Sequence, residues 1–519
     1  MPNITHLSVK KDVPADKGVY WDQIFIEDML KGLGKSDRHV FLIPGKYQND
    51  SESVWKINAE LAKHEKVLIF IHGDEEGLFN VGLIKHPDSI VYSQCGNGGF
   101  MFPLGYTPNT RETLKKIGYR KKDRDWFFAG QITHSRRKLC VEQLRKLKGG
   151  ELVETDGFGK GIAHEDYLES LSEAKTAPSP SGAVSVESFR LYEALEAGCI
   201  PIADDMSPIR STRSDYWHKL FGGSAPFPVF TDYNELPDLI NKASHYPNYN
   251  NKVFAWWINM KFQFREQLKK DLGIEKGEMV AVVPVSPIKG HPDTSILEET
   301  IKSIRVHTDC PIVITFDGVR EEQEDRRADY NEFVSRMLWK CNFEYENVLP
   351  IIFDHHSHQS GMMKHFLQSI DMPMILYVEQ DTPLTPDRKI DWEKCKDYIR
   401  SGKANLIRFH FEEVIPDVHE YLMIGGVHDG FRKTVQWSQR PHLASQEIYR
   451  IAMGLFSKDS NCFIESYMHG VVQDIWREQG MKGWDKWKMF IYHPDGGIKR
   501  SYHLDGSAGE SNLEELNIY

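Results

Sequence analysis

The chain has 519 residues, enough for about three or four domains of roughly 150 residues, which excludes a peptide or a single small module. Hydrophobic residues make up 40% and charged residues 27%, the proportions of an ordinary globular protein rather than of a fibrous or disordered chain. Lys and Arg number 64 against 75 Asp and Glu, and this net charge of −11 argues against a surface that binds nucleic acid throughout.

The cysteines and the apolar runs point to a reducing compartment. The seven cysteines are an odd number and none of them pairs at CxxC spacing, so we expect neither a disulfide framework nor a thiolate zinc site. The N-terminus lacks an apolar run of signal-peptide length, and the longest apolar runs elsewhere are far too short to cross a membrane. We therefore expect a cytoplasmic protein, of a bacterium or of an infected host cell, with no membrane partner.

Short apolar runs bounded by turn signals alternate with amphipathic stretches, a pattern typical of buried parallel strands covered by helices. The first series of predicted strands covers residues 39–44, 66–73, 89–94, 125–130 and 198–204. The second series covers residues 279–286, 311–318, 373–381 and 405–411. A long helical pattern over residues 246–275 separates the two series, so we place a domain boundary near residue 276 and predict an α/β fold on both sides of it.

Charge differs between these two parts of the chain. Residues 1–275 carry a net charge of −1, and the remainder carries −10. Within the first part, residues 101–150 hold 13 basic and 4 acidic side chains. This local surplus favours either a face for a polyanion or a solvated helix surface.

The most informative segment is residues 177–205, where a loop rich in Pro, Ser and Gly leads into a helix that we expect to begin near Ser185. The N-terminus of such a helix presents free amides, which suit a diphosphate. Arg190 would add a bidentate cation, and Glu193 could accept hydrogen bonds from ribose hydroxyls. The alternative is that Arg190 and Glu193 pair with each other on an exposed helix face.

The pattern S-x-R-x-x-E-A-L-x-x-G-C-I-P-I, from Ser188 to Ile202, resembles the signature of the exostosin family of glycosyltransferases. Upstream, residues 126–139 resemble the strand, glycine and basic helix start of that family. There Gly130 would let the backbone approach a phosphate, and Arg136 or Arg137 could neutralise it. Ser188 and Glu193 join them as candidates for donor binding.

This resemblance covers about residues 40–245 and implies a GT-B fold of two Rossmann halves. The N-terminal half would be about 1–124, the donor-binding half about 125–245, and a crossing helix would span 246–275. The family places a general base on the N-terminal half. The loop after the strand VLIFI carries His72, Asp74 and Glu75, which are the base candidates, although an acidic loop of this kind is also a common turn.

The second series of strands contains the triplet Glu379-Gln380-Asp381 at the end of a strand. Carboxylates at the carboxyl edge of a sheet can hold a hard divalent cation between Asp381 and a donor diphosphate. The triplet resembles the DxD element of GT-A glycosyltransferases with Glu379 in place of the first Asp, so Glu379 is a donor-binding candidate. On its own the pattern also fits a solvated turn.

Other residues follow the order of that fold. Asp317 after the second strand and Lys364 in a later helix are donor-binding candidates. His503 resembles the late His that often completes the metal site of GT-A enzymes, so it is a candidate metal ligand together with Asp381. An imidazole among carboxylates suits Mn²⁺ better than Mg²⁺. Glu465 resembles the base of inverting GT-A enzymes, with a helix-capping carboxylate as the alternative.

The loop of residues 433–445 carries Trp437 and Arg440, which could form an acceptor platform or simply pack in the interior. No Walker A sequence, GxSxG elbow or kinase signature is present, so hydrolase and phosphotransferase functions have no support.

Together these patterns predict a glycosyltransferase of two fused modules, a GT-B module at residues 1–275 and a GT-A module at residues 276–519 that uses Mn²⁺ or Mg²⁺. Each would move a sugar from a nucleotide-sugar to a hydroxyl. The order of modules resembles the heparan-sulfate copolymerases, which carry membrane anchors that this chain lacks. The acceptor is therefore either a bacterial or viral glycan or a hydroxymethylated pyrimidine in phage DNA. The alternative is that one half is a non-catalytic module that binds sugar or nucleic acid.

Overall fold

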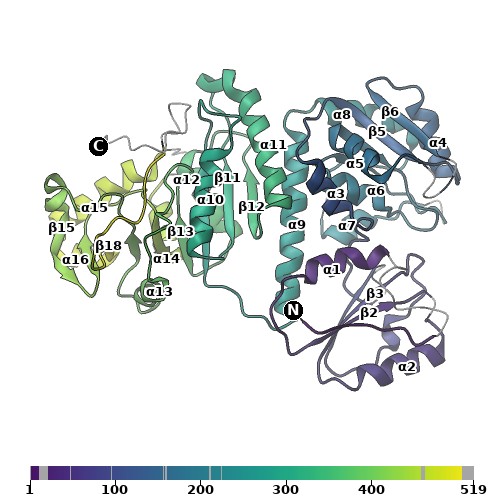
Figure 1. The fold of residues 1–519 in the computed structure, drawn as a ribbon, viewed down its shortest axis with the longest axis horizontal. Helices are drawn as coiled ribbons and strands as arrows, with labels where there is room; N and C mark the ends of the chain where they lie inside the picture. Colours follow the sequence, from purple (N-terminus) through teal and green to yellow (C-terminus); the bar gives the residue numbers. More distant parts are fainter. Residues whose placement is uncertain are drawn as a thin grey trace. The chain divides into compact units, whose positions relative to one another are not determined.

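The computed structural model describes residues 2–10, 21–46, 48–94, 96, 98–155, 157, 161–209, 212–223, 225–457 and 462–504. The chain divides into two compact units, unit 1 (Met1–Lys276) and unit 2 (Gly277–Tyr519) (Figure 1). Both units combine helices with sheets that contain parallel strands, so the predicted α/β class is confirmed. Among the helices of the described ranges, none combines the length and the apolar character needed to cross a bilayer.

The first sheet of unit 1 has four parallel strands in the order β1-β2-β3-β4. These strands are β1 (Ile4–His6), β2 (His39–Pro44), β3 (Val67–His72) and β4 (Ser89–Ser93). The helical segments in this part of the chain are η1 (Trp21–Gln23), α1 (Ile24–Leu30), α2 (Ser51–Leu61) and η2 (Val81–Leu83). Every residue of β3 is buried, as expected of a central parallel strand covered on both faces.

The second sheet of unit 1 has five parallel strands in the order β6-β5-β7-β8-β9. They are β5 (Arg124–Gln131), β6 (Gly150–Thr155), β7 (Ala174–Ser179), β8 (Ile200–Asp204) and β9 (Val229–Phe230). The helical segments are α3 (Thr110–Ile117), α4 (Ser135–Leu144), α5 (His164–Glu173), α6 (Phe189–Glu196), α7 (Tyr216–Phe221), η3 (Tyr233–Glu235) and α8 (Leu236–His245). The expected loop after Ala177 and helix start near Ser185 are therefore wrong in detail, because residues 177–179 belong to β7 and α6 begins at Phe189.

One long helix, α9 (Tyr249–Asp271), contacts both sheets of unit 1. Trp257 in α9 stacks on Phe25 of α1 with ring centroids 6.0 Å apart, and the Tyr92 hydroxyl of β4 donates to Asp271 at 2.6 Å. On the side of the second sheet, Trp257 Nε1 donates to Glu196 of α6 at 2.8 Å. Since apolar residues of both sheets and of α9 form one buried cluster, the two halves of unit 1 share a core.

Unit 2 has a nine-stranded sheet in the order β12-β11-β10-β13-β17-β14-β18-β16-β15. Its strands are β10 (Met279–Val285), β11 (Ile312–Phe316), β12 (Val348–Ile352), β13 (Met374–Tyr377), β14 (Leu406–Arg408), β15 (Met423–His428), β16 (Phe431–Thr434), β17 (His442–Ser445) and β18 (Met489–Tyr492). β10 to β13 are mutually parallel, whereas β17 runs antiparallel to both β13 and β14.

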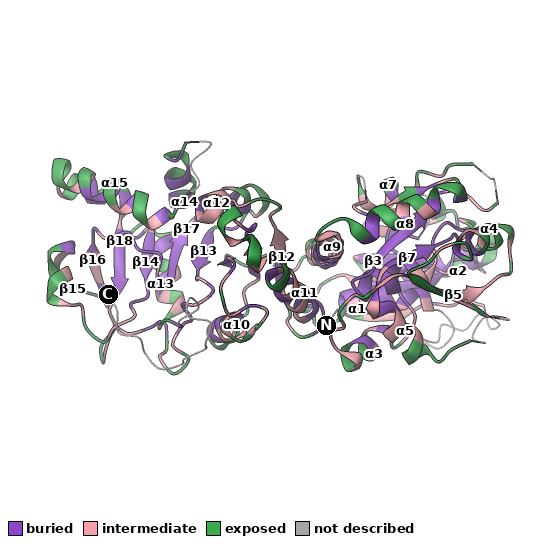
Figure 2. Ribbon diagram, turned by 90° about the horizontal axis from the view of Figure 1, so that it is seen from above, coloured by how far each residue is buried: buried purple, intermediate pink, exposed green. Residues whose placement is uncertain are grey.

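The helical segments of unit 2 are α10 (Ser295–His307), η4 (Glu321–Arg326), α11 (Arg327–Phe343), α12 (His358–Ser369), α13 (Trp392–Arg400), η5 (Asp417–Leu422), α14 (Gln446–Gly454), α15 (Ile464–Gln479) and α16 (Met481–Trp487). Figure 2 shows the central strands of this sheet buried and the edge strand β15 largely exposed, with exposed faces on helices such as α15. The carboxyl ends of β10, β13 and β14 lie at one edge of the sheet, where open α/β sheets place their ligands.

Candidate functional site

The first candidate site lies at the carboxyl edge of the second sheet in unit 1. Helix α4 begins four residues after β5 and carries Arg137 in its first turn. Helix α6 follows the loop after β7 and carries Arg190 in its first turn. Because β5 and β7 are parallel neighbours, both arginines start from the same edge of the sheet.

Arg190 is held against β5. Its Nη2 donates to the carbonyl of Ala129 at 2.7 Å, and its guanidinium lies 4.6 Å from the centroid of the Phe128 ring. A Cβ atom at Gly130 would overlap Nη2 of Arg190, so glycine provides the space that the guanidinium occupies. Gly130 and Arg190 therefore form one local arrangement, 60 positions apart in the chain.

Several buried donors in this region lack a hydrogen-bond partner among the described residues. They are Nε of Arg137, Nε of Arg190, Oγ of Ser181, Oγ of Ser188 and Nε2 of His134. Burial lowers the pKa of Arg137 to about 10, and the neighbouring Arg190 adds to the effect. A buried donor without a partner costs about 1–3 kcal/mol, so this group of donors is suited to an anion.

Arg136 makes different contacts from its neighbour Arg137. Its Nε donates to Oδ2 of the buried Asp204 at 2.8 Å, and its guanidinium lies 4.6 Å from the ring centroid of Tyr233. The Tyr233 hydroxyl also donates to Asp204, at 2.8 Å. Arg136 thus fixes the end of β8, while Arg137 and Arg190 supply the unpaired guanidinium nitrogens.

Glu193 is buried and does not pair with Arg190. It accepts hydrogen bonds from the Thr107 hydroxyl at 2.5 Å and from the Tyr167 hydroxyl at 2.9 Å. The alternative of an exposed Arg190–Glu193 pair is therefore wrong, since Arg190 donates to Ala129 instead.

The base candidate Asp74 is occupied by its own turn. Its carboxylate is fully buried and accepts the backbone N–H groups of Leu78 at 2.8 Å and Phe79 at 2.9 Å. This geometry fits the turn alternative for Asp74 rather than a proton-accepting role.

Glu75 is the more accessible acid of the same loop. Burial raises its pKa, and the charge of Asp22 raises it further. The buried His72 lies with Nδ1 3.3 Å from Oδ1 of Asp22. Trp21, next to Asp22, has its ring centroid 5.9 Å from that of Phe189, the first residue of α6. The loop of Glu75 thus lies on the side of the first half that contacts the start of α6.

Glu187 connects the two halves of unit 1 beside this region. Its buried carboxylate accepts the backbone N–H of Leu104 at 3.1 Å and the hydroxyl of Tyr192. Burial raises the pKa of Glu187 to about 7. The sequence predicted no role for Glu187 or Asp22, because Leu104 and His72, which they contact, lie far away along the chain.

In unit 2, the structure brings both predicted metal ligands together. Oδ2 of Asp381 lies 3.7 Å from Nε2 of His503. The N–H of Leu504 donates to the carbonyl of Asp381 at 2.7 Å, which holds the C-terminal segment beside the acidic triplet. Two ligands of one octahedral ion with bonds of about 2.1 Å lie about 3 Å apart, so small side-chain movements would let both contact one ion. Within the described part of the chain, no group of three metal-binding side chains is found.

Glu379 and Glu465 lie beside Asp381. Glu379 accepts from Nε2 of Gln359 at 2.5 Å and from the Tyr377 hydroxyl at 3.3 Å. Burial raises the pKa of Glu379, and the charges of Asp381 and Glu465 raise it further. Glu465 accepts the N–H of Gln439 at 2.9 Å. Three predicted acids thus gather at one edge of the sheet.

The remaining candidates of unit 2 have other contacts. Asp317 is buried and accepts the backbone N–H groups of Ser357 at 2.7 Å and His358 at 3.0 Å, which orders the loop before α12. Lys364 donates to the carbonyl of Ser457 at 2.8 Å. Trp437 is fully buried, so the packing alternative holds for it.

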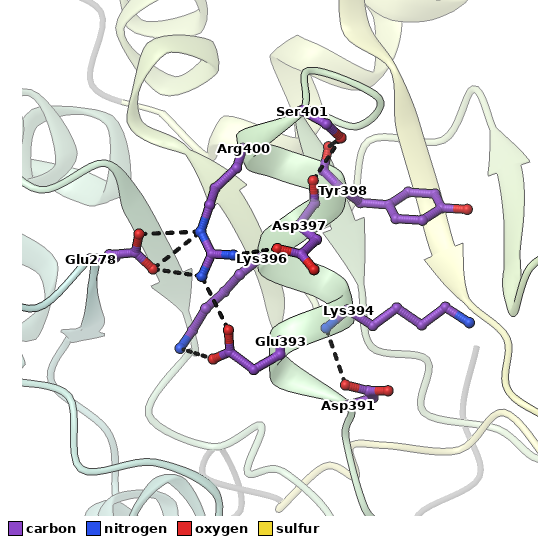
Figure 3. A network of polar contacts seen from close by, with 9 residues as sticks. All are labelled: Glu278, Asp391, Glu393, Lys394, Lys396, Asp397, Tyr398, Arg400 and Ser401. Carbon is purple, nitrogen blue, oxygen red and sulfur yellow. Dashed lines mark hydrogen bonds and ion pairs between the residues drawn. The ribbon is translucent and has the colours of Figure 1, made fainter.

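An exposed network of ion pairs on α13 lies in a separate surface hollow (Figure 3). Arg400 contacts Glu278 at 2.8 Å and Glu393 at 3.1 Å. Exposed pairs of this kind contribute little to stability, because solvent screens their charges. This network involves none of the predicted site residues.

Much of the basic surplus at residues 101–150 is paired with acidic side chains of unit 1. The pairs are Arg111–Glu196, Arg120–Glu169, Arg124–Glu151, Arg136–Asp204 and Arg145–Glu154. The excess of basic over acidic residues in segment 101–150 therefore overstates the positive charge available to bind a polyanion.

A family model described as the RXYLT1 C-terminal domain, of an exostosin-like xylosyltransferase family, matches residues 153–273. The match runs from the end of β6 through α9 and includes Ser188, Arg190 and Glu193. It supports the glycosyltransferase prediction for this segment and does not extend into unit 2. No curated protein matches the chain.

Three solved structures show distant similarity at TM-scores below 0.5. The crystal structure of S. aureus TarS has a TM-score of 0.28 and 9% identity, and the similarity covers 44% of this chain and 36% of that chain. S. aureus TarS 1–349 in complex with UDP-GlcNAc has a TM-score of 0.27 and 9% identity, over 44% of this chain and 58% of that chain. The mannosyltransferase PcManGT from Pyrobaculum calidifontis, in complex with GDP-Man and Mn²⁺, has a TM-score of 0.26 and 8% identity, over 48% and 69%. The chain thus spans about a third of TarS and just over half of its fragment.

Proposed function

We propose that the chain is a nucleotide-sugar-dependent glycosyltransferase, with a GT-B fold in unit 1 and a GT-A fold in unit 2. The observation that carries the proposal is the group of buried, unpaired donors at the edge of the second sheet. The family match over residues 153–273 includes three of them, Ser181, Ser188 and Arg190.

In unit 1, the donor diphosphate is bound by Arg137 and Arg190, with the hydroxyls of Ser181 and Ser188 completing its contacts. Guanidinium groups bind phosphate oxygens through charge-assisted hydrogen bonds. As the bond between the sugar and the diphosphate breaks, negative charge grows on the leaving oxygen. Fixed donors that face this charge stabilise the transition state, and they need no rearrangement at that moment.

The acceptor hydroxyl attacks the anomeric carbon of the donor and must lose its proton. Glu75 takes this proton in our proposal, because its carboxylate is partly buried and its pKa is raised toward the range that suits a general base. Asp22 holds the loop of Glu75 through His72 and acts as a positioning residue. Asp74 has a structural role, because its carboxylate accepts two backbone N–H groups of its own turn.

In unit 2, Asp381 and His503 would hold a divalent cation, Mn²⁺ or Mg²⁺. When bound, such an ion neutralises the diphosphate of the donor. Glu465 is the proposed base, and the N–H of Gln439 fixes its carboxylate. Glu379 keeps its proton because burial and the neighbouring acids raise its pKa, so it acts as a hydrogen-bonding group rather than as a second metal ligand.

We propose a glycan hydroxyl as the acceptor, and not DNA. Five arginines of the basic segment already pair with acidic side chains, which leaves less positive charge for a phosphate backbone.

The test is release of nucleoside diphosphate from UDP-, GDP- and CMP-sugars, with Mn²⁺ or with EDTA. We expect Arg190→Gln to abolish one activity and Asp381→Asn to abolish a second, EDTA-sensitive one. The control is Arg145→Gln, which removes an exposed guanidinium of unit 1 paired with Glu154. Loss of a single activity in only one variant would make the other unit a non-catalytic module, and the failure of every donor to bind would overturn the proposal.

A further inference from the structure

Two arginines and a histidine lie together at the ends of β14 and β17 in unit 2. The antiparallel pairing of these strands places Arg408 opposite His442. The ladder continues with the N–H of Phe409 donating to the carbonyl of Pro441 at 2.8 Å. Because alternate residues of a strand point to the same face, Arg408 and His410 share a face with Arg440.

These side chains carry buried donors that the protein leaves unpaired. Arg408 is 3% exposed, and only its Nη1 has a partner, Oε1 of Gln436 at 2.8 Å. Among the described residues, its Nε and Nη2, both ring nitrogens of His410 and Nη1 of Arg440 have no hydrogen-bond partner. His410 is also 3% exposed, and the nearest carboxylate oxygen recorded for it, on Glu412, is 3.7 Å away.

The acids of the neighbouring site do not satisfy these donors. Glu465 accepts the N–H of Gln439, and Glu379 accepts from Gln359 and Tyr377. Burial lowers the pKa of Arg408 to about 10, and Glu465 only partly opposes this effect. Burial also lowers the pKa of Arg440, although Glu379 and Asp381 oppose the shift. The two guanidinium groups therefore remain without an ion pair in the described part of unit 2.

We infer that Arg408, His410 and Arg440 bind an oxyanion on the acceptor, a carboxylate or a phosphate ester, so that unit 2 transfers its sugar to an anionic sugar. This inference rests on the proposed function of unit 2 and names the class of its acceptor. A planar guanidinium matches two oxygens of either group, and two such groups beside an imidazole can surround one oxyanion.

The position of Arg408 and His410 assigns the oxyanion to the acceptor rather than to the donor, whereas Arg440 lies next to β17, one strand closer to Asp381. Asp381, which faces the donor diphosphate in our proposal, follows β13, and β17 lies between β13 and β14. Neighbouring strands lie about 4.8 Å apart, so the β14 residues are about 10 Å from the β13 edge. That distance fits one sugar residue between the donor diphosphate and the bound oxyanion.

The experiment measures binding by the full-length protein of glucuronate, glucose 6-phosphate, glucose and inorganic phosphate, by calorimetry and by thermal stabilisation. We expect glucuronate or glucose 6-phosphate to bind at millimolar concentration and glucose not to bind. Arg408→Gln should weaken this binding at least tenfold. The control Arg477→Gln removes an exposed arginine of α15 that pairs with Asp474, and it should leave binding unchanged.

Two further measurements separate the outcomes. Arg440→Gln is a second test should Arg408→Gln fail to fold, and circular dichroism checks both variants. Binding of UDP or GDP with Mn²⁺ is measured in the same samples and should not change in Arg408→Gln. If the protein binds the nucleotide but neither anionic sugar, the inference is overturned and the proposed function stands. If it binds an anionic sugar but no nucleotide, the three residues form an anion pocket and unit 2 does not transfer a sugar, which overturns both. Inorganic phosphate binding as well as both sugars would mean an adventitious ion only and would also overturn the inference.

Discussion

A single methyl group at Gly130 tests whether Arg190 contacts the donor. In Gly130→Ala the new Cβ would overlap Nη2 of Arg190, and the guanidinium would have to leave its place. That movement breaks the hydrogen bond to the carbonyl of Ala129 and the contact with the Phe128 ring. The backbone of Gly130 does not need the left-handed region, so alanine fits its conformation.

The expected magnitude follows from these contacts. A hydrogen bond to a charged group contributes about 1.5–3 kcal/mol, and each 1.4 kcal/mol is a factor of about ten in affinity. Loss of the Arg190 contact to the diphosphate should therefore weaken nucleotide binding by about 10- to 100-fold. Because the displaced guanidinium loses its hydrogen bond to Ala129, the free energy of unfolding should fall by about 1.5–3 kcal/mol.

Calorimetric titration with UDP and GDP measures the affinity, and urea unfolding measures the stability. The matched control is Gly223→Ala, since a Cβ at Gly223 meets nothing within 4 Å and its φ is also ordinary. The proposed link between the glycine and the arginine is refuted if Gly130→Ala binds nucleotide as tightly as Gly223→Ala does while Arg190→Gln binds it more weakly.

Three further substitutions test other parts of the structure. Asp381→Asn should remove the Mn²⁺-dependent part of nucleotide binding, and an unchanged difference between Mn²⁺ and EDTA in calorimetry would contradict the metal site. Glu196→Gln should destabilise unit 1 by about 3–5 kcal/mol, because Arg111 and Lys261 would lose the buried carboxylate with which both of them pair; a loss below about 1 kcal/mol in urea unfolding would rule this out. Burial raises the pKa of Glu187 from 4.5 to about 7 in the folded protein. The stabilisation from its protonated form is therefore complete below pH 4.5 and is lost as the pH rises through 7. The difference in melting temperature between wild type and Glu187→Gln should therefore change between pH 4.5 and pH 7, and the corresponding change in the free energy of unfolding is at most about 3 kcal/mol. If the melting temperatures of the two proteins follow parallel curves against pH, the Glu187 carboxyl does not titrate in this range.

The sequence predicted several of the central strands and missed β7, β17 and β18. Residues 39–44 form β2 as expected, because a short run of apolar residues bounded by polar ones is typical of a buried strand. Strand β7, Ala174–Ser179, contains Pro178 and small residues, a composition that predicts a loop rather than a strand. It is nevertheless a central strand that pairs with β5 and β8, since tertiary contacts override its weak propensity.

The site was predictable as a region and not as a set of contacts. Arg136 and Arg137 are neighbours in sequence, yet one pairs with Asp204 and the other has an unpaired nitrogen, because successive helical residues point in different directions. Asp22 meets His72 across 50 positions of chain, and no local pattern indicates such a partner. Arg408 was read only as part of a strand, although pairing with β17 is what brings it to Arg440.

Helix α9 also has a consequence for how the protein is made. Phe25 and Tyr92 belong to the part of unit 1 that is synthesised first, but both are covered by side chains of α9, which is synthesised last in that unit. One side of the first sheet has a core cluster of its own, but a nascent chain cannot cover Phe25 and Tyr92 until α9 has left the ribosome, so this part of the core forms last. An expression fragment that ends before Tyr249 leaves these rings exposed, and adding α9 as a separate peptide offers a route to restore them.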